Sequence, residues 1–110
     1  MLIVTTNDVP GYKISKVLGP VYGTSVRSRN FFGNVFGSFK SLFGGKQAGF
    51  IRMISQTRDH ALESLSENAN RIGANAVVAM RFDSGEFGTG NGMTMNEVTA
   101  YGTAVIISEA

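Results

Sequence analysis

The fold is decided by residues 58–83, which read RDHALESLSENANRIGANAVVAMRFD. Up to Ile72 the apolar residues recur at the spacing of a helix, and from Ala76 onward they alternate as in a strand. Gly73 stands between the two patterns, where a glycine commonly ends a helix. The pattern therefore predicts a long helix that passes through one glycine into a strand and folds back over the sheet that this strand enters.

The helix is predicted to run from Gln47 to Ile72. A helix of about 25 residues is roughly 37 Å long, which is enough to span a whole sheet. Arg71 lies in its last turn, where a cation interacts favourably with the helix dipole. The apolar face predicted to cover the sheet consists of Ile51, Ile54, Ala61, Leu62, Leu65, Ala69 and Ile72.

Strands are predicted over residues 1–6, 12–30, 76–83 and 93–108. The second should be interrupted near Gly19-Pro20, because proline cannot donate to a strand ladder. Beyond this point, one face of the strand carries only small residues, which predicts that another element packs closely on it: Val21, Gly23 and Ser25. One face of the third strand is predicted to consist of Ala76, Val78, Met80 and Phe82.

Residues 84–92 are rich in glycine and are predicted to form a hairpin loop. A glycine-rich phosphate cradle needs a strand before it and a helix after it, whereas here a strand follows. The expected fold class is α+β: a single domain over residues 1–110, with an antiparallel sheet of three to four strands packed on one long helix.

The segment Phe31 to Phe43 holds five of the eight phenylalanines of the chain. Four of them share one helical stripe, which predicts a short Phe-rich helix: Phe32, Phe36, Phe39 and Phe43. Packing in the core or against another subunit is the favoured interpretation. A membrane-surface helix and a stacking platform for nucleic acid are the alternatives.

The composition limits the class of protein. Of the 110 residues, 43% are apolar and only 16% are charged, which suggests that copies of the chain cover part of its surface. The absence of cysteine excludes disulfides, thiolate zinc sites and iron–sulfur ligation, and it fits a cytoplasmic location. No window approaches the roughly 20 apolar residues of a transmembrane helix, and the N-terminus lacks the basic region of a signal peptide.

Charge is distributed unevenly along the chain, although the net charge is only +2. Residues 1–55 carry seven basic side chains and one acid, a balance of +6, and residues 56–110 carry three basic side chains and seven acids, a balance of −4. Such asymmetry is typical of a nucleic-acid face or of complementary surfaces that meet in head-to-tail subunit contacts. The second interpretation is favoured, because the basic residues are scattered and form no run.

Three stretches together resemble the YbjQ-like family, a small uncharacterised family named for heavy-metal binding. They are Gly23-Thr24-Ser25 with Arg29-Asn30 and Gly44-Gly45, then residues 57–65 running into 73–78, and lastly residues 95–105 ending in Tyr101-Gly102-Thr103-Ala104-Val105. The resemblance covers essentially the whole chain. It implies a dodecin-like subunit, in which an antiparallel sheet wraps a long helix, within a ring-shaped homo-oligomer, most simply a pentamer.

Candidate sites for metal ions and catalysis are weak. His60, Glu63 and Glu67 share one helix face, but soft heavy metals prefer thiolates or several imidazoles, and the chain has no cysteine and one histidine. Ser55, Asp59 and Ser64 lie near His60 in sequence, on a face that offers no pocket for a catalytic triad. We therefore predict no catalytic residue, no resident cofactor and no metal site within one chain.

Arg58 is the sharper candidate. It lies four residues after Ile54 and four before Leu62, on or near the predicted apolar face, where a charge needs a partner. An ion pair or a hydrogen bond across a subunit contact is the favoured interpretation, and a bound anion is the alternative. If the contact is between subunits, Arg58→Ala should weaken or abolish the oligomer.

The sequence thus favours a non-enzymatic, ring-forming cytoplasmic protein that acts as a ligand-binding or scaffolding module and whose main partner is itself, possibly in stacked rings. A heavy-metal-binding protein is the first alternative. A peripheral membrane or nucleic-acid binder acting through residues 13–52 is the second.

Overall fold

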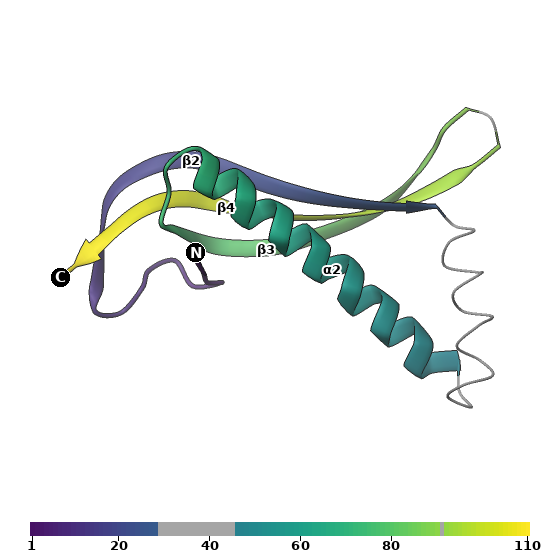
Figure 1. Cartoon of the computed structure of the whole chain (residues 1–110), viewed down its shortest axis with the longest axis horizontal. Helices are drawn as coiled ribbons and strands as arrows, with labels where there is room; N and C mark the ends of the chain where they lie inside the picture. The colour runs from purple at the N-terminus through teal and green to yellow at the C-terminus, as the bar shows by residue number, and fades with distance from the viewer. Residues whose placement is uncertain (29–45, 91) are drawn as a thin grey trace.

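The computed structural model describes residues 1–28, 46–90 and 92–110. In chain order, its elements are β1 (Leu2–Ile3), β2 (Tyr12–Ser28), α2 (Lys46–Arg71), β3 (Ala76–Gly88) and β4 (Thr94–Glu109), as Figure 1 shows. The α+β class is confirmed, and α2 is the one helix within the described ranges. The short Phe-rich helix predicted over residues 31–43 lies outside them.

The strands form one sheet in the order β1-β3-β4-β2. Both β2 and β3 run antiparallel to β4, but β1 runs parallel to β3, with Leu2 opposite Ala76 and Ile3 opposite Val77. The prediction of an antiparallel sheet is therefore wrong at this edge, and the sheet is mixed. A parallel pair needs a long crossover connection, and here all of β2 and α2 lie between the two strands.

The helix α2 crosses the sheet at a slant (Figure 1). Its buried side chains recur at every fourth position: Met53, Thr57, Ala61, Leu65 and Ala69. This row is inclined by about 26° to the helix axis, so a helix that packs along it crosses the strands obliquely. The predicted apolar face is wrong at Ile51, Ile54 and Ile72, which are 65%, 47% and 50% exposed, because the helix packs along the inclined row and not along a stripe parallel to its axis.

The helix ends as predicted, at a glycine. Gly73 has a φ of 91°, its N–H donates to the Asn70 carbonyl at 3.0 Å, and the Ala74 N–H donates to the Ala69 carbonyl at 3.0 Å. This bond pair defines a Schellman motif, which needs a left-handed residue at the Gly73 position. The motif turns the chain directly into β3.

The small face predicted for β2 packs against α2, as expected. Val21, Gly23 and Ser25 are all buried. A Cβ atom at Gly23 would lie only 2.5 Å from the Ala61 carbonyl oxygen and 2.6 Å from the Ser64 carbonyl carbon. The backbone of the helix therefore rests directly on the strand at this point.

A β-bulge at Ala79 changes which side chains of β3 face the helix. Ala79 has a φ of 55°, and the register with β4 shifts between Val78 and Arg81. Before the bulge, Val77 joins the core cluster under α2; after it, Met80 and Phe82 do. The predicted face is therefore wrong at its first half, since Ala76 and Val78 belong to a second cluster with Val105, Val4 and Val9.

The bulge is held by the N-terminal segment. The Ala79 N–H donates to the Thr6 carbonyl at 2.8 Å, and the Met80 N–H donates to the Val4 carbonyl at 3.0 Å. Two backbone donors that the distorted ladder would leave unpaired are thereby satisfied.

The strand β3 is longer than predicted. Residues 84–88, which were predicted to belong to the loop, lie in the ladder, with Gly85 opposite Glu97 and Gly88 opposite Thr94. Glycine lowers strand propensity but does not prevent pairing, which here is imposed by β4.

The strand β2 forms one edge of the sheet, consistent with the proline at position 20. Its register with β4 shifts next to Gly19, as the predicted interruption requires. Two carbonyls of this strand accept side-chain hydrogen bonds: Asn68 Nδ2 donates to the Tyr22 carbonyl at 2.8 Å, and Arg27 Nη1 donates to the Val26 carbonyl at 3.0 Å. Side chains therefore occupy part of the backbone polar groups of the edge strand.

Candidate binding groove around Arg58

A groove of about 390 Å³ lies between α2 and the β3–β4 part of the sheet. Residues from all three elements line it: Ile54, Arg58, Phe82, Ser84, Gly85, Glu86, Asn96, Glu97 and Val98. Its volume falls in the range typical of small-molecule sites. Two further grooves, each of about 280 Å³, lie at the other end of α2.

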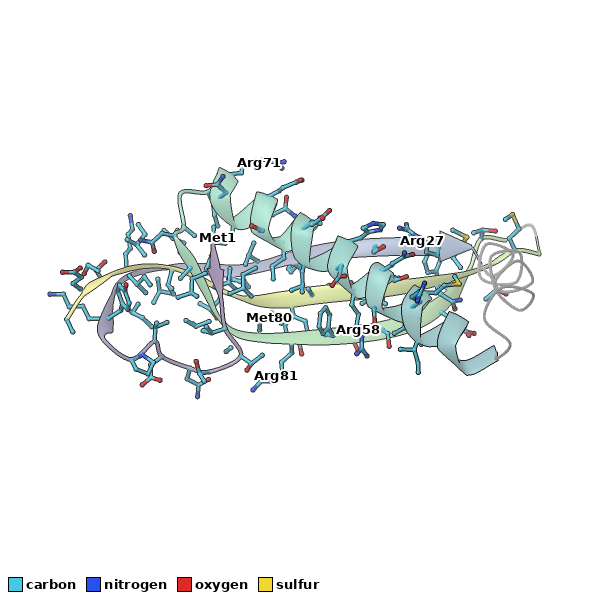
Figure 2. All side chains as sticks on the ribbon, turned by 60° about the horizontal axis from the view of Figure 1, so that its bottom comes forward. Met1, Arg27, Arg58, Arg71, Met80 and Arg81 are labelled. Carbon is cyan, nitrogen blue, oxygen red and sulfur yellow. The ribbon has the colours of Figure 1, made fainter. Side chains whose placement is uncertain are left out.

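The structure places Arg58 on the rim of this groove (Figure 2). The guanidinium carbon lies 5.3 Å from the centroid of the Phe82 ring, an arrangement that stabilises a cation at an exposed site by about 0.5–1 kcal/mol. Arg58 is exposed, and no carboxylate among the described residues lies within ion-pair distance of it. Within one chain, Arg58 therefore contacts an aromatic ring while its charge faces solvent, and the expected subunit contact or bound anion stays a prediction.

The Ala79 bulge decides which β3 side chains reach the groove. After the bulge the even-numbered residues face α2, so Phe82, Ser84 and Glu86 lie on the helix side. Sequence reasoning missed Ser84 and Glu86, which it assigned to a loop. An alanine in the left-handed region carries no sequence signature, so the alternation offered no signal for the switch.

Three polar side chains of the groove are free for a ligand. Within the described residues, the side chains of Ser84, Glu86 and Asn96 make no hydrogen bond or ion pair with another protein group. Glu97 differs, because its Oε2 accepts a 2.6 Å hydrogen bond from Thr99 Oγ1, which itself lies 3.0 Å from Thr24 Oγ1. That chain of side chains lies on the sheet face away from α2.

His60 is engaged by Arg27 rather than by acids. Arg27 Nη2 is hydrogen-bonded to His60 Nδ1, so the imidazole contacts the guanidinium of β2. Among the described residues, no group of three or more His, Cys, Asp and Glu side chains could hold a metal ion. The absence of catalytic function stays a prediction.

A family model described as "putative heavy-metal-binding" matches residues 1–108, so the chain belongs to this YbjQ-type family. A UPF0145 protein of Acidiphilium cryptum is 57% identical over 107 residues, which cover 97% of this chain and 94% of that protein. UPF0145 proteins of the archaea Sulfurisphaera tokodaii and Thermoplasma volcanium are 46% and 42% identical, over 100% and 99% of this chain and 93% and 86% of theirs.

A solved structure shares the fold. It is the crystal structure of a protein of unknown function from the DUF74 family of Pediococcus pentosaceus, with a TM-score of 0.62 and 20% identity over 98% of both chains.

Within the described residues, no helix of this chain is long and apolar enough to cross a bilayer.

Proposed function

We propose that the chain is a non-enzymatic, ring-forming homo-oligomer of the cytoplasm, most simply a pentamer, that works as a ligand-binding or scaffolding module. The observation that carries the proposal is where the large apolar side chains lie. Six of the thirteen buried apolar residues in the described part are alanines, whereas most of the exposed large apolar side chains are branched or aromatic. In a monomer, many of the large apolar side chains would therefore be exposed to water.

The exposed set lies on several parts of the surface. Val17 is 63% exposed in the first half of β2, Ile51 is 65% exposed near the start of α2, and Tyr22 and Tyr101 stand opposite each other across β2 and β4. More than one patch is what a ring requires, because each subunit then contacts two neighbours through different surfaces.

The dimensions support the same proposal. The radius of gyration is 17.1 Å, and the principal extents are 52, 35 and 19 Å. A compact domain of this length has a radius of gyration of about 13 Å. An elongated, flat subunit buries little of its own surface, and partner subunits compensate for that deficit.

Native mass spectrometry of protein purified without a chelator tests the proposal. We expect five copies per particle, or ten if two rings stack, with no metal retained in stoichiometric amounts. A particle with the mass of one chain would contradict ring formation. The mass measured under denaturing conditions serves as the single-chain control.

The family description favours heavy-metal binding as the second candidate function. Because the described part of one chain offers no cluster of ligands, such a site would have to combine residues from several subunits. A metal ion retained at one fixed ratio per ring would support this alternative. The membrane or nucleic-acid interpretation rests mainly on the Phe-rich segment, which lies outside the described residues.

A further inference from the structure

We propose that the Arg58 groove binds a small zwitterion of the α-amino-acid type that carries an apolar side chain. This inference deepens the ligand-binding role proposed above and names the chemistry of its ligand. It starts from the opposite charges that line one groove without pairing: Arg58 on α2 and Glu86 on β3.

Two opposite charges that share a groove without forming an ion pair suit a zwitterion. Arg58 and Glu86 line the same groove, but no ion pair within 4 Å joins them in the described structure. A sphere of 390 Å³ is about 9 Å across, which leaves room for a carboxylate against the guanidinium and an ammonium group against the glutamate. A purely anionic ligand would be repelled by Glu86, and a purely cationic one by Arg58.

The Phe82 ring prepares Arg58 for this role. The guanidinium carbon lies over the ring at 5.3 Å from its centroid, and this contact restricts the side chain. A guanidinium held in place loses less conformational freedom when it binds a carboxylate through two parallel hydrogen bonds.

The remaining residues of the groove define the rest of the ligand. Ile54, Phe82 and Val98 provide an apolar surface, and Ser84 and Asn96 add uncharged polar groups. An aliphatic side chain of a few carbons would cover the apolar part while the charged end spans Arg58 and Glu86. Few polar groups beside an apolar lining is the usual composition of a small-molecule site.

Equilibrium dialysis with radiolabelled leucine tests the proposal on the full chain. The competitors are 4-methylpentanoate, which lacks only the amine, and 3-methylbutylamine, which lacks only the carboxylate. We expect saturable leucine binding, with each competitor at least tenfold weaker than unlabelled leucine. Absence of saturable binding up to about 10 mM, or equal competition by either analogue, would overturn the proposal.

Two variants locate the site. Arg58→Ala should weaken leucine binding at least tenfold, and Glu86→Gln should remove the advantage of leucine over 4-methylpentanoate. The matched controls are Arg71→Ala and Glu67→Gln, exposed positions of α2 that do not line this groove. Native binding by both groove variants would overturn the assignment, and Glu86→Gln alone decides it if Arg58→Ala does not fold.

The mass of each variant is measured in parallel. A single-chain mass with leucine selectivity intact would contradict the ring and leave the groove standing. A ring without selectivity would overturn the groove and leave the ring standing.

Discussion

Within the described structure, the Ser25 hydroxyl is a buried polar group without a hydrogen-bond partner. The residue is 5% exposed beneath α2, and its Oγ has no hydrogen-bond partner. A buried hydroxyl without a partner costs about 1–3 kcal/mol, so this position sacrifices stability in order to keep a small side chain under the helix.

Replacing that hydroxyl should stabilise the protein. We expect Ser25→Ala to raise the free energy of unfolding by about 0.5–1.5 kcal/mol, measured by urea denaturation, because alanine removes the unpaired group and keeps the size. The control is Ser15→Ala, which deletes a hydroxyl that donates to the Ile106 carbonyl at 3.0 Å and should bring no gain. A loss of stability in Ser25→Ala would mean that the hydroxyl has a partner in solution.

At Gly23 the backbones of the helix and the sheet approach each other closely. Gly23→Ala should lower the free energy of unfolding by about 3 kcal/mol or more, because the added methyl would overlap the backbone of α2 near Ala61 and Ser64. Gly88→Ala, at a strand position with nothing within 4 Å, is the matched control and should change stability by less than about 1 kcal/mol. Equal effects in urea melts would refute this packing.

Among the elements, the bulged strand β3 has the greatest influence on the site. Its Ala79 occupies a left-handed conformation that costs an alanine about 1 kcal/mol. The bulge nevertheless turns Phe82 and Glu86 toward the groove, while Val77 ahead of it faces the core under α2. Local strain and the geometry of the candidate site are therefore linked through one residue.

Substitutions at Ala79 test this strain. Ala79→Gly should raise the free energy of unfolding by about 0.5–1 kcal/mol, since glycine adopts positive φ without a steric penalty. Ala79→Val should lower it by about 1–3 kcal/mol, because a β-branched residue is disfavoured there. The two variants are compared in the same urea titration, and a shift of the same sign in both would contradict the bulge.

The junction between α2 and β3 is held by the amide of Asn75. Its Nδ2 donates to the Ile107 carbonyl at 2.9 Å, and its Oδ1 accepts from the Ile107 N–H at 2.7 Å. Asn75→Ala should cost about 1–2 kcal/mol and accelerate hydrogen exchange of the Ile107 amide, with the Val105 region unaffected. Unchanged exchange at Ile107 would show that another group protects it.

The sequence predicted the elements better than their contacts. The helix, its glycine end and the small face of β2 follow from local patterns, and all three are present. The faces of α2 and β3 could not be read in the same way, because the helix packs along an inclined row and Ala79 reverses the alternation. Arg58 could be predicted as a site residue because its charge lies on or near the apolar face of the helix. Glu86 could not, because the glycines around it are typical of a loop.

At the scale of the whole molecule, folding and assembly should be coupled. For a five-chain ring, a hundredfold rise in protein concentration should stabilise each chain by about 2 kcal/mol, because dilution favours dissociated, unfolded chains. Urea midpoints measured at about 1 and 100 μM should therefore differ. Identical midpoints would indicate a subunit that is stable alone.

The order of the strands also has a consequence for synthesis. Of the described strands, β4 is the last in the chain, yet it lies between β3 and β2, and Tyr12 finds its partner only at Glu109. During synthesis on the ribosome, β2 therefore cannot form its full ladder until almost the whole domain has been translated. Contacts between residues so far apart slow folding, and the waiting strand leaves apolar side chains such as Val17 open to other nascent chains.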